Sequence, residues 1–295
     1  MELLPLYDIW RLIEYPRDFN ESEIRGTCRS IYLGDTTVLC RVLGRYKMFV
    51  DTRDIGISSH LMLEGYWEMW VTEAMLRCVR RGSTVIDVGA NLGYFTILTA
   101  DLTGPEGRVL AFEPNPALVE RARNSIEVNG FSGFVTLHDC ALGEAEGRVT
   151  LDFIPQHPGG GRVHEQGDAA NPNTSAVTFP VRRLDSFPEA LDAEFIKIDV
   201  EGFEQHVWRG MTGIFDRGHP LTIFMEFTVV RYEDPRGFLA EIADEGFSLE
   251  IIDYRDGIQP ITVEEIMARP HSIDHMLVFR RDRMPPPGAA AEAAA

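Results

Sequence analysis

From residue 84 onwards, apolar runs of strand length alternate with segments that repeat apolar residues at helical spacing. The strand-length runs are TVIDVG, RVLAFEP, FVTLHDC, RVTLDFI, VTFPVRRL, EFIKIDV, LTIFMEF, FSLEIID and HMLVFRR. The helical segments are 92–102, one that begins at Asn115-Pro116 and stops at Asn129-Gly130, 201–209 and 235–245. Strands that alternate with helices predict an α/β domain built on a mostly parallel sheet.

The first 60 residues have a different pattern. It predicts one helix and three strands, at 6–13, 27–33, 36–43 and a run that ends near 52. Gly34-Asp35 supplies the turn between the first two strands, and 61–80 has the spacing of one amphipathic helix. We therefore expect three parts, which are an N-terminal helix and β-hairpin cap at 1–60, the α/β domain at 61–283 and a disordered tail at 284–295.

The net charge of the chain narrows the classes of partner that it is expected to bind. Among 295 residues the formal net charge is −18, so the average surface repels nucleic acid and an anionic membrane. No run of 18 apolar residues occurs, and the N-terminus lacks the basic and apolar segments of a signal peptide. The four cysteines show no close pairing. We therefore expect a cytoplasmic protein with neither a nucleic-acid nor a membrane partner.

The stretch VIDVGANLGYFT predicts a strand, a tight turn and a helix that opens over a cofactor. A dinucleotide site places G-x-G-x-x-G here, so that the backbone approaches the pyrophosphate. In this chain Asn91 stands in place of the middle glycine, and Asp87 precedes the turn. A carboxylate at this point repels phosphate and favours a cationic ligand. The pattern therefore favours S-adenosylmethionine, which carries an ammonium and a sulfonium and no phosphate.

Four predicted strands end in carboxylates: Asp87, Glu113, Asp139 and Asp199. Ligands of open α/β sheets bind outside the carboxyl ends of the strands. Glu113 stands 24 positions after Gly89, where an acid accepts hydrogen bonds from ribose hydroxyls. Asp139 is placed to accept a hydrogen bond from an adenine amino group. Strand-end acids also cap the next helix, and this alternative stays open for each of them.

These blocks, VIDVGANLGYFT, FEPNP, LHDCALG and FIKIDVEGFE, together resemble the FkbM-type S-adenosylmethionine-dependent methyltransferases over roughly residues 60–230. The resemblance implies a class I methyltransferase fold, a Rossmann-like sheet of seven strands in which the last strand, HMLVFRR, is reversed. It also implies methyl transfer mainly to oxygen, on sugars, natural products or carboxylates. Residues 61–283 would form the methyltransferase domain, with S-adenosylmethionine as its cofactor.

Carried over residue by residue, the resemblance puts the methionine part of the cofactor at the glycine turn, the ribose at Glu113 and the adenine near Asp139 and Ala141. Asp199 would face the transferred methyl group, and Glu68 would contact the cofactor from Gly65-Tyr66-Trp67-Glu68. The predicted cofactor-binding residues are Glu68, Asp87, Gly89, Ala90, Asn91, Gly93, Glu113, Pro114, Asn115, Asp139, Cys140, Ala141 and Asp199.

Transfer of a methyl group to a hydroxyl needs a base within hydrogen-bond reach, whereas a carboxylate acceptor needs positioning alone. We predict Asp199 as the base or the orienter of the acceptor, supported by Glu201 and Glu226. Helix-dipole compensation is the competing explanation for Glu201. His164, in the Gly/Pro-rich segment 155–180, is an alternative base, and the three glycines 159–161 would make that segment a lid.

Several alternatives remain open. The three carboxylates also suit Mg²⁺, although no metal is predicted. A nucleotide-dependent oxidoreductase and a non-catalytic protein that binds S-adenosylmethionine are the competing functions. The sequence does not name the small-molecule or glycan acceptor. It also leaves open whether 27–52 forms a dimer arm or a cap over the cofactor.

Overall fold

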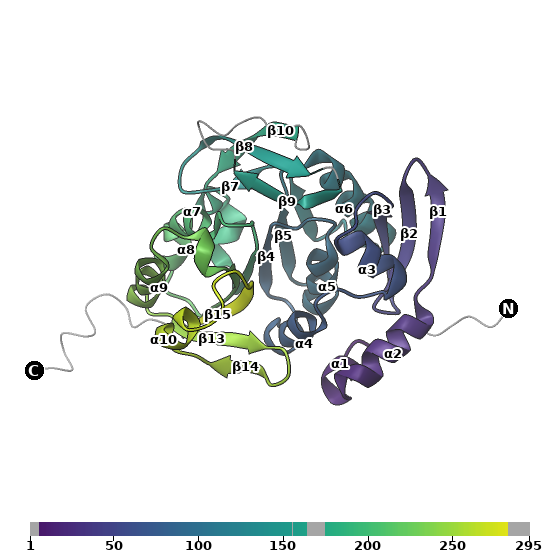
Figure 1. Cartoon of the computed structure of the whole chain (residues 1–295), viewed down its shortest axis with the longest axis horizontal. Coiled ribbons are helices and arrows are strands. Elements are labelled where there is room, and N and C mark those ends of the chain that lie inside the picture. Colours follow the sequence, from purple (N-terminus) through teal and green to yellow (C-terminus); the bar gives the residue numbers. More distant parts are fainter. Residues whose placement is uncertain (1–5, 155, 164–174, 283–295) are drawn as a thin grey trace, which may run out of the picture.

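The computed structural model describes residues 6–154, 156–163 and 175–282. Its centre is an eight-stranded sheet with the order β14-β13-β15-β12-β11-β4-β5-β6 (Figure 1). The strands are β4 (Thr84–Val88), β5 (Arg108–Phe112), β6 (Val135–His138), β11 (Phe195–Ile198), β12 (Leu221–Phe227), β13 (Ser248–Asp253), β14 (Gly257–Pro260) and β15 (His275–Arg281). The central pairs from β12 to β6 are parallel, as the alternation of strands and helices predicted.

The reversed strand is present, and the sheet has one strand more than the seven that the resemblance implied. β15 runs antiparallel to both β12 and β13, which confirms the reversal predicted for HMLVFRR. An eighth strand, β14, pairs antiparallel with β13, so two strands of the sheet are reversed rather than one. The extra hairpin has a local cause. The Asp253 carboxylate accepts hydrogen bonds from the backbone N–H groups of Arg255 and Asp256, and Gly257 follows with a φ of +71°.

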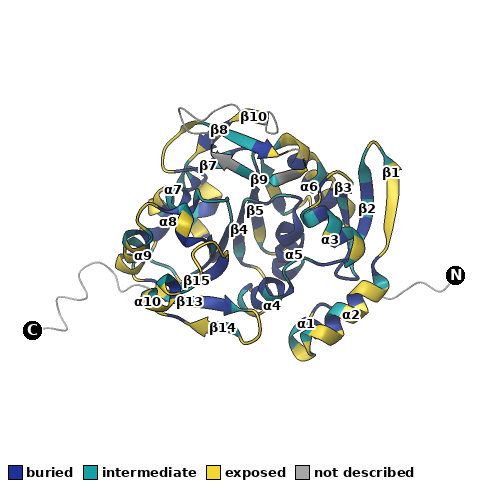
Figure 2. Ribbon diagram, in the orientation of Figure 1, coloured by how far each residue is buried: buried dark blue, intermediate teal, exposed yellow. Residues whose placement is uncertain are grey.

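Helices cover both faces of this sheet, and each face has its own hydrophobic cluster. One face carries α4 (Met69–Cys78), α5 (Tyr94–Thr103) and α6 (Pro116–Val128). The other carries α7 (Glu204–Arg209), α8 (Thr212–Phe215), α9 (Pro235–Asp244) and α10 (Val263–Met267), with the 3₁₀ turns η1 (Leu184–Ser186), η2 (Pro188–Asp192) and η3 (Val229–Arg231). Figure 2 shows the strands between these layers as the most deeply buried part of the molecule. Among the described residues, no helix is both long and apolar enough to cross a bilayer.

The prediction of one helix over 61–80 is wrong. The chain forms α3 (Ile57–Leu63), then a turn, and then α4. The turn places Gly65 at a φ of +79° and Glu68 at +35°. A side chain at Gly65 would meet Cys28 and the carbonyl oxygen of Arg41, so tertiary packing selects the glycine there. Helical spacing of the apolar residues does not reveal such a break, because both halves bury the same kind of face.

The N-terminal segment forms α1 (Arg11–Glu14), α2 (Arg17–Thr27) and a three-stranded meander of β1 (Ser30–Gly34), β2 (Thr37–Val42) and β3 (Tyr46–Asp51). The turn predicted at Gly34-Asp35 joins β1 to β2. β3 packs along α6, where Arg121 and Asp51 form an ion pair at 2.5 Å. The apolar residues of this segment share one cluster with α4 and α5. The division at residue 60 stays a prediction.

A second sheet is inserted between β6 and β11. It has the order β7-β10-β8-β9 and consists of β7 (Ala141–Leu142), β8 (Gly147–Ile154), β9 (His157–Val163) and β10 (Ser175–Arg182). In Figure 1 this sheet lies beyond the carboxyl ends of β4 and β5. The glycines 159–161, predicted as a hinge, form part of β9. His164 lies outside the described residues, and so does part of the predicted lid at 155–180.

Candidate functional site

A cavity of about 310 Å³ opens at the carboxyl ends of β4, β5, β11 and β12. Its floor is the turn after β4, and its walls include residues of α3, α5 and the inserted sheet. The described residues that line it include Asp54, Ile57, Trp67, Glu68, Gly89, Ala90, Asn91, Phe95, Phe112, Glu113, Pro114, Cys140, Ala141, Phe153, Lys197, Asp199, Glu201, Phe203, Glu226 and Asp274. The cavity therefore lies where an open α/β sheet binds its ligand.

The turn between β4 and α5 requires glycine at its first position. Gly89 has a φ of +78°, and a β-carbon there would lie 1.9 Å from the carbonyl oxygen of Asp199. This close approach brings the end of β11 directly against the turn. Gly159 of β9 packs on the same turn, since a β-carbon at that position would lie 2.1 Å from Nδ2 of Asn91. Glycine thus lets three segments meet at the floor of the cavity.

Glu113 holds the turn in place from the end of β5. Its Oε2 accepts a hydrogen bond from the backbone N–H of Asn91 at 2.9 Å, and its Oε1 accepts one from that of Asn115 at 2.8 Å. Burial raises the pKa of Glu113 to about 7. Each carboxylate oxygen has two lone pairs, so Glu113 retains acceptor capacity toward the cavity that it lines.

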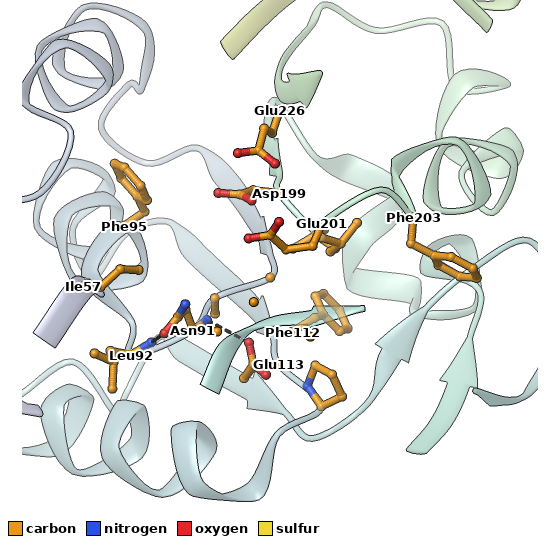
Figure 3. A pocket seen from close by; sticks show the side chains of 18 of the residues that line it. Ile57, Asn91, Leu92, Phe95, Phe112, Glu113, Asp199, Glu201, Phe203 and Glu226 are labelled. Atoms are coloured by element: carbon orange, nitrogen blue, oxygen red, sulfur yellow. Dashed lines mark hydrogen bonds between the residues drawn. The ribbon is translucent and has the colours of Figure 1, made fainter. Parts of the chain in front are cut away.

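Three carboxylates meet on the opposite side of the cavity. One oxygen each from Asp199, Glu201 and Glu226 lies within 4.8 Å of the others, and Figure 3 shows the three side chains pointing into the same space. Asp199 follows β11, Glu201 lies in the turn before α7, and Glu226 belongs to β12. The structure therefore brings together the three acids that we predicted for the acceptor side. Their catalytic role stays a prediction.

Two cations compensate part of this negative charge. Nζ of Lys197 lies 3.0 Å from Oδ2 of Asp199, and Arg231 contacts Glu201 at 2.7 Å and also pairs with Glu226. Burial alone would lower the pKa of Lys197, but the carboxylates of Asp199 and Asp87 raise it above its usual value. The lysine is therefore charged. Burial raises the pKa of Glu201 to about 7 and also raises that of Glu226, with the Asp199 charge adding to both shifts.

Glu68 faces the same cavity from the turn before α4. Its Oε2 is buried and has no hydrogen-bond partner among the described residues. Burial raises its pKa to about 7. Glu68, Asn91 and Glu201 all have positive φ angles, of +35°, +53° and +58°, although none of them is glycine. Strained residues of this kind concentrate at functional sites, where packing holds them in place.

Some predicted residues lie away from the cavity wall. Asp87 is 1% exposed and accepts a hydrogen bond from Thr96 of α5, so it lies behind the turn. Asn115 caps α6 by accepting a hydrogen bond from the Ala117 N–H. Gly93 is the N-terminal cap residue of α5, and Asp139 is exposed beside the wall that Cys140 and Ala141 form. These four residues are adjacent to the cavity without lining it.

Other wall residues were missed by the sequence analysis. The sequence does point to Lys197 as a functional residue, because it is a charged residue inside an otherwise apolar strand and is one of only two lysines in the chain. No feature of the sequence points to Asp54, since it accepts hydrogen bonds from the N–H groups of Gly56 and Ser58 and resembles an ordinary helix cap. Phe153 reaches the cavity from the inserted sheet, whose position no local pattern predicts.

The hydrogen-bond donors and acceptors of the described cavity residues fit S-adenosylmethionine. The cavity lining contains seven acidic side chains and one ammonium group, and those acids that are ionised repel a doubly negative pyrophosphate and attract a sulfonium. Glu113 would hold the ribose, and the turn at Gly89–Asn91 together with Glu68 would hold the methionine part. The buried Oε2 of Glu68 is an acceptor that a methionine ammonium group would satisfy.

A sheet of this order, with a reversed strand next to β12 and a cavity at the glycine turn, is the class I methyltransferase fold. Residues 87–255 match the family model of the Methyltransferase FkbM domain. The chain belongs to the FkbM methyltransferase family, as the resemblance of its motifs implied. It uses S-adenosylmethionine, and an oxidoreductase function therefore has no support.

Several known methyltransferases are similar to this chain. Methyltransferase 1 of Beauveria bassiana is 33% identical over 147 residues, which are 44% of this chain and 58% of that protein. Methyltransferase sdnD of Sordaria araneosa is 24% identical over 197 residues, 56% of this chain and 73% of that protein. The protein-L-isoaspartate O-methyltransferase of Methanococcoides burtonii is 36% identical over 69 residues, 22% of this chain and 34% of that protein. The match thus spans little more than half of the first relative.

Solved structures with similar chains include a SAM-dependent O-methyltransferase from Thermotoga maritima. It is 12% identical, with a TM-score of 0.42, over 86% of this chain and 95% of that chain. M. jannaschii TYW2 in complex with AdoMet is 15% identical, with a TM-score of 0.43, over 86% of this chain and 90% of that chain.

Proposed function

We propose that this methyltransferase transfers the methyl group to a hydroxyl oxygen of a small molecule or glycan, with Asp199 as the base or the orienter of that hydroxyl. The observation that carries the proposal is the cluster of three carboxylates in the wall of the cavity, from Asp199, Glu201 and Glu226. A hydroxyl is a poor nucleophile until its proton is accepted, so a base within hydrogen-bond reach accelerates the reaction about 10²- to 10⁴-fold.

Asp199 is the best placed of the three acids. It follows β11 directly, its backbone carbonyl touches the glycine turn, and its side chain is only 26% exposed. The charged ammonium of Lys197, 3.0 Å away, holds the Asp199 carboxylate in position. Arg231 forms ion pairs with both Glu201 and Glu226. Asp199 pairs with Lys197 instead.

The charge of the cavity also bears on the acceptor. A carboxylate acceptor, as the name of the M. burtonii relative would suggest, would have to approach seven carboxylates and one ammonium group in the described lining. A neutral or cationic hydroxyl compound meets no such repulsion. The bound cofactor supplies an activated methyl group, and the residues of the chain supply orientation, exclusion of water and a place for the proton.

The proposal is tested by methyl transfer to matched pairs of acceptors. The purified protein is incubated with methyl-labelled S-adenosylmethionine and with sugars paired with their uronic acids, such as glucose with glucuronic acid. Labelled methyl ethers are the expected products. Methyl esters formed only from the uronic acids would replace the hydroxyl proposal by carboxylate methylation. Tight binding of S-adenosylhomocysteine without turnover on any acceptor would favour the non-catalytic alternative.

Replacement of the proposed base separates catalysis from cofactor binding. Once an acceptor is found, Asp199→Asn should lower kcat about 100-fold or more, because the amide cannot accept the proton. S-adenosylhomocysteine lacks the methyl group that Asp199 would face, so its dissociation constant, measured by calorimetry, should change less than about threefold. Asp216→Asn, at an exposed carboxylate that ends α8, is the matched control and should change neither value. Full activity in Asp199→Asn would exclude Asp199 as the base.

A further inference from the structure

β1 is a free edge of the N-terminal sheet and carries consecutive exposed apolar side chains. It pairs with β2 on one side only, within the part of the chain that the structure describes. Ile31, Tyr32 and Leu33 are 60%, 64% and 53% exposed, and Figure 2 shows most of the strand as exposed. Natural edge strands are usually protected by charged residues or proline, and Ser30–Gly34 contains neither. An edge of this kind favours pairing with another strand.

The hydrogen-bonding direction of β1 identifies the groups that are free to pair. The Arg41 backbone N–H donates to the Arg29 carbonyl at 2.8 Å, so the backbone groups of Arg29 face β2. Because these groups alternate along a strand, Ile31 also faces β2, and Ser30 and Tyr32 turn their N–H and C=O groups to the open edge. The pairing with β2 becomes irregular after Tyr32, which limits the regular open edge to this short segment.

The charges at the two ends of β1 indicate what pairs with it. Arg29 precedes the strand and Asp35 follows it, and both are exposed. An antiparallel copy of the same strand brings Arg29 of one molecule toward Asp35 of the other, and twofold symmetry repeats the contact. A parallel copy would set like charges together. Opposite charges across strands stabilise a pair, and long side chains also reach diagonal neighbours.

We propose that two copies of this chain associate through β1, antiparallel about a twofold axis at Ile31, so that the two N-terminal sheets become one six-stranded sheet. Ser30 of each copy then pairs with Tyr32 of the other through four backbone hydrogen bonds, and the two Ile31 side chains face each other. The inference is independent of the proposed function, because none of these residues lines the cavity.

Cysteine cross-linking tests the twofold axis. In Ile31→Cys the two thiols should lie on Cα atoms about 4.5 Å apart, which suits a disulfide. In Leu33→Cys, on the same face of the same strand, the two copies of the residue should lie about four residues apart along the pair, roughly 13 Å. Under mild oxidation we expect a disulfide-linked dimer from Ile31→Cys and none from Leu33→Cys or the wild type. No linkage at position 31, or equal linkage at both positions, would overturn the proposal.

Charge reversal tests the same contact without new cysteines. Arg29→Glu and Asp35→Lys should each raise the dimer dissociation constant about tenfold, since each turns two attractive pairs into repulsive ones. A 1:1 mixture of the two variants should form a heterodimer within about threefold of the wild-type affinity, because both pairs are attractive again. Light scattering over a concentration series measures the dissociation constants of the two variants and of their mixture. A damaged fold would not be rescued by mixing, so failure of the mixture to associate, or a wild type that stays monomeric, would refute the β1 dimer.

Discussion

At the scale of single residues, Lys197 connects the strands to the chemistry. It is 2% exposed, stands beside Asp87 in the register of β11 and β4, and contacts Asp199. Its ammonium also lies 4.9 Å from the ring centroid of Phe95. A buried ion pair gives little net stability, but the loss of one partner leaves an uncompensated charge. Lys197 thus places a positive charge between two carboxylates, one behind the glycine turn and one in the cavity wall.

Removal of the lysine should therefore cost stability that a second substitution restores. Lys197→Met should lower the free energy of unfolding by roughly 3 kcal/mol, because it leaves Asp87 buried without a cation. Asp87→Asn combined with Lys197→Met should recover part of this loss, and urea unfolding measures both variants. Lys47→Met, at the exposed lysine of β3, is the control and should cost less than about 0.5 kcal/mol. Equal losses of unfolding free energy in Lys197→Met and Lys47→Met would contradict the charge-compensating role of Lys197.

At the scale of elements, the site depends on how closely the turn after β4 approaches the end of β11. Gly89 permits this approach by having no β-carbon at 1.9 Å from a carbonyl oxygen. The approach aligns the glycine turn with Asp199, although these residues are 110 positions apart in the sequence. The parallel pairing of β4 with β11 thus turns two separate motifs into one cavity.

A comparison of two glycines separates this contact from backbone strain. Gly82 has a φ of +80°, close to the +78° of Gly89, but nothing lies within 4 Å of a β-carbon there. Gly82→Ala should cost about 1 kcal/mol for the left-handed conformation. Gly89→Ala should cost roughly 4 kcal/mol or more and abolish binding of S-adenosylhomocysteine, as measured by urea unfolding and calorimetry. If the two variants are equally stable and bind equally, the steric account of the turn is incorrect.

Much of the central sheet could be predicted, because its strands are apolar runs between clear turn and cap residues. Asn115 caps α6 as the Asn-Pro pair indicates, and Glu113 and Asp199 reach the cavity because parallel strands end at one edge. β9 could not be predicted, because its residues 157–163 are rich in glycine and lack an apolar pattern. Glu201 was expected to open a helix, but it lies in a turn at a φ of +58° and α7 begins at Glu204.

The remaining errors have one physical origin, which is that tertiary contacts are invisible in a local pattern. The turn that holds Glu68 depends on contacts of Gly65 with Cys28 and Arg41. Asp87 is correctly placed along the strand, but its side chain turns toward Thr96 of α5 and away from the cavity. Strand alternation alone does not decide which side of a covered sheet faces a ligand.

At the scale of the whole molecule, acidic side chains gather in the cavity that we propose as the cofactor site. The net charge is −18, and seven carboxylates belong to the described lining of one cavity. Burial raises the pKa of Glu68, Glu113 and Glu201 to about 7 each. A carboxyl group whose pKa is raised on folding binds its proton more tightly in the folded state. Its contribution to stability is complete below the unfolded pKa and is lost as the pH rises through 7.

The protein without cofactor should accordingly lose stability between about pH 5 and pH 8. The melting temperature measured at intervals of pH gives this slope. Glu68→Gln removes one of the three groups at constant shape and should make the slope shallower. At lower pH the trend reverses for Asp51, whose pKa is lowered to about 2 by its hydrogen bonds to Arg53 and the charge of Arg121, which outweigh its burial. A melting temperature that is constant from pH 5 to pH 8 would show that the cavity carboxylates titrate normally.

The carboxylate-lined cavity also has a kinetic consequence. Methyl transfer converts a sulfonium into a neutral thioether, so the reactant carries one more positive charge than the product. We therefore expect a cofactor site with a wall of acids to hold S-adenosylmethionine more tightly than S-adenosylhomocysteine. Such a site would favour exchange of spent cofactor for fresh cofactor and would limit inhibition of each turnover by the product of the one before.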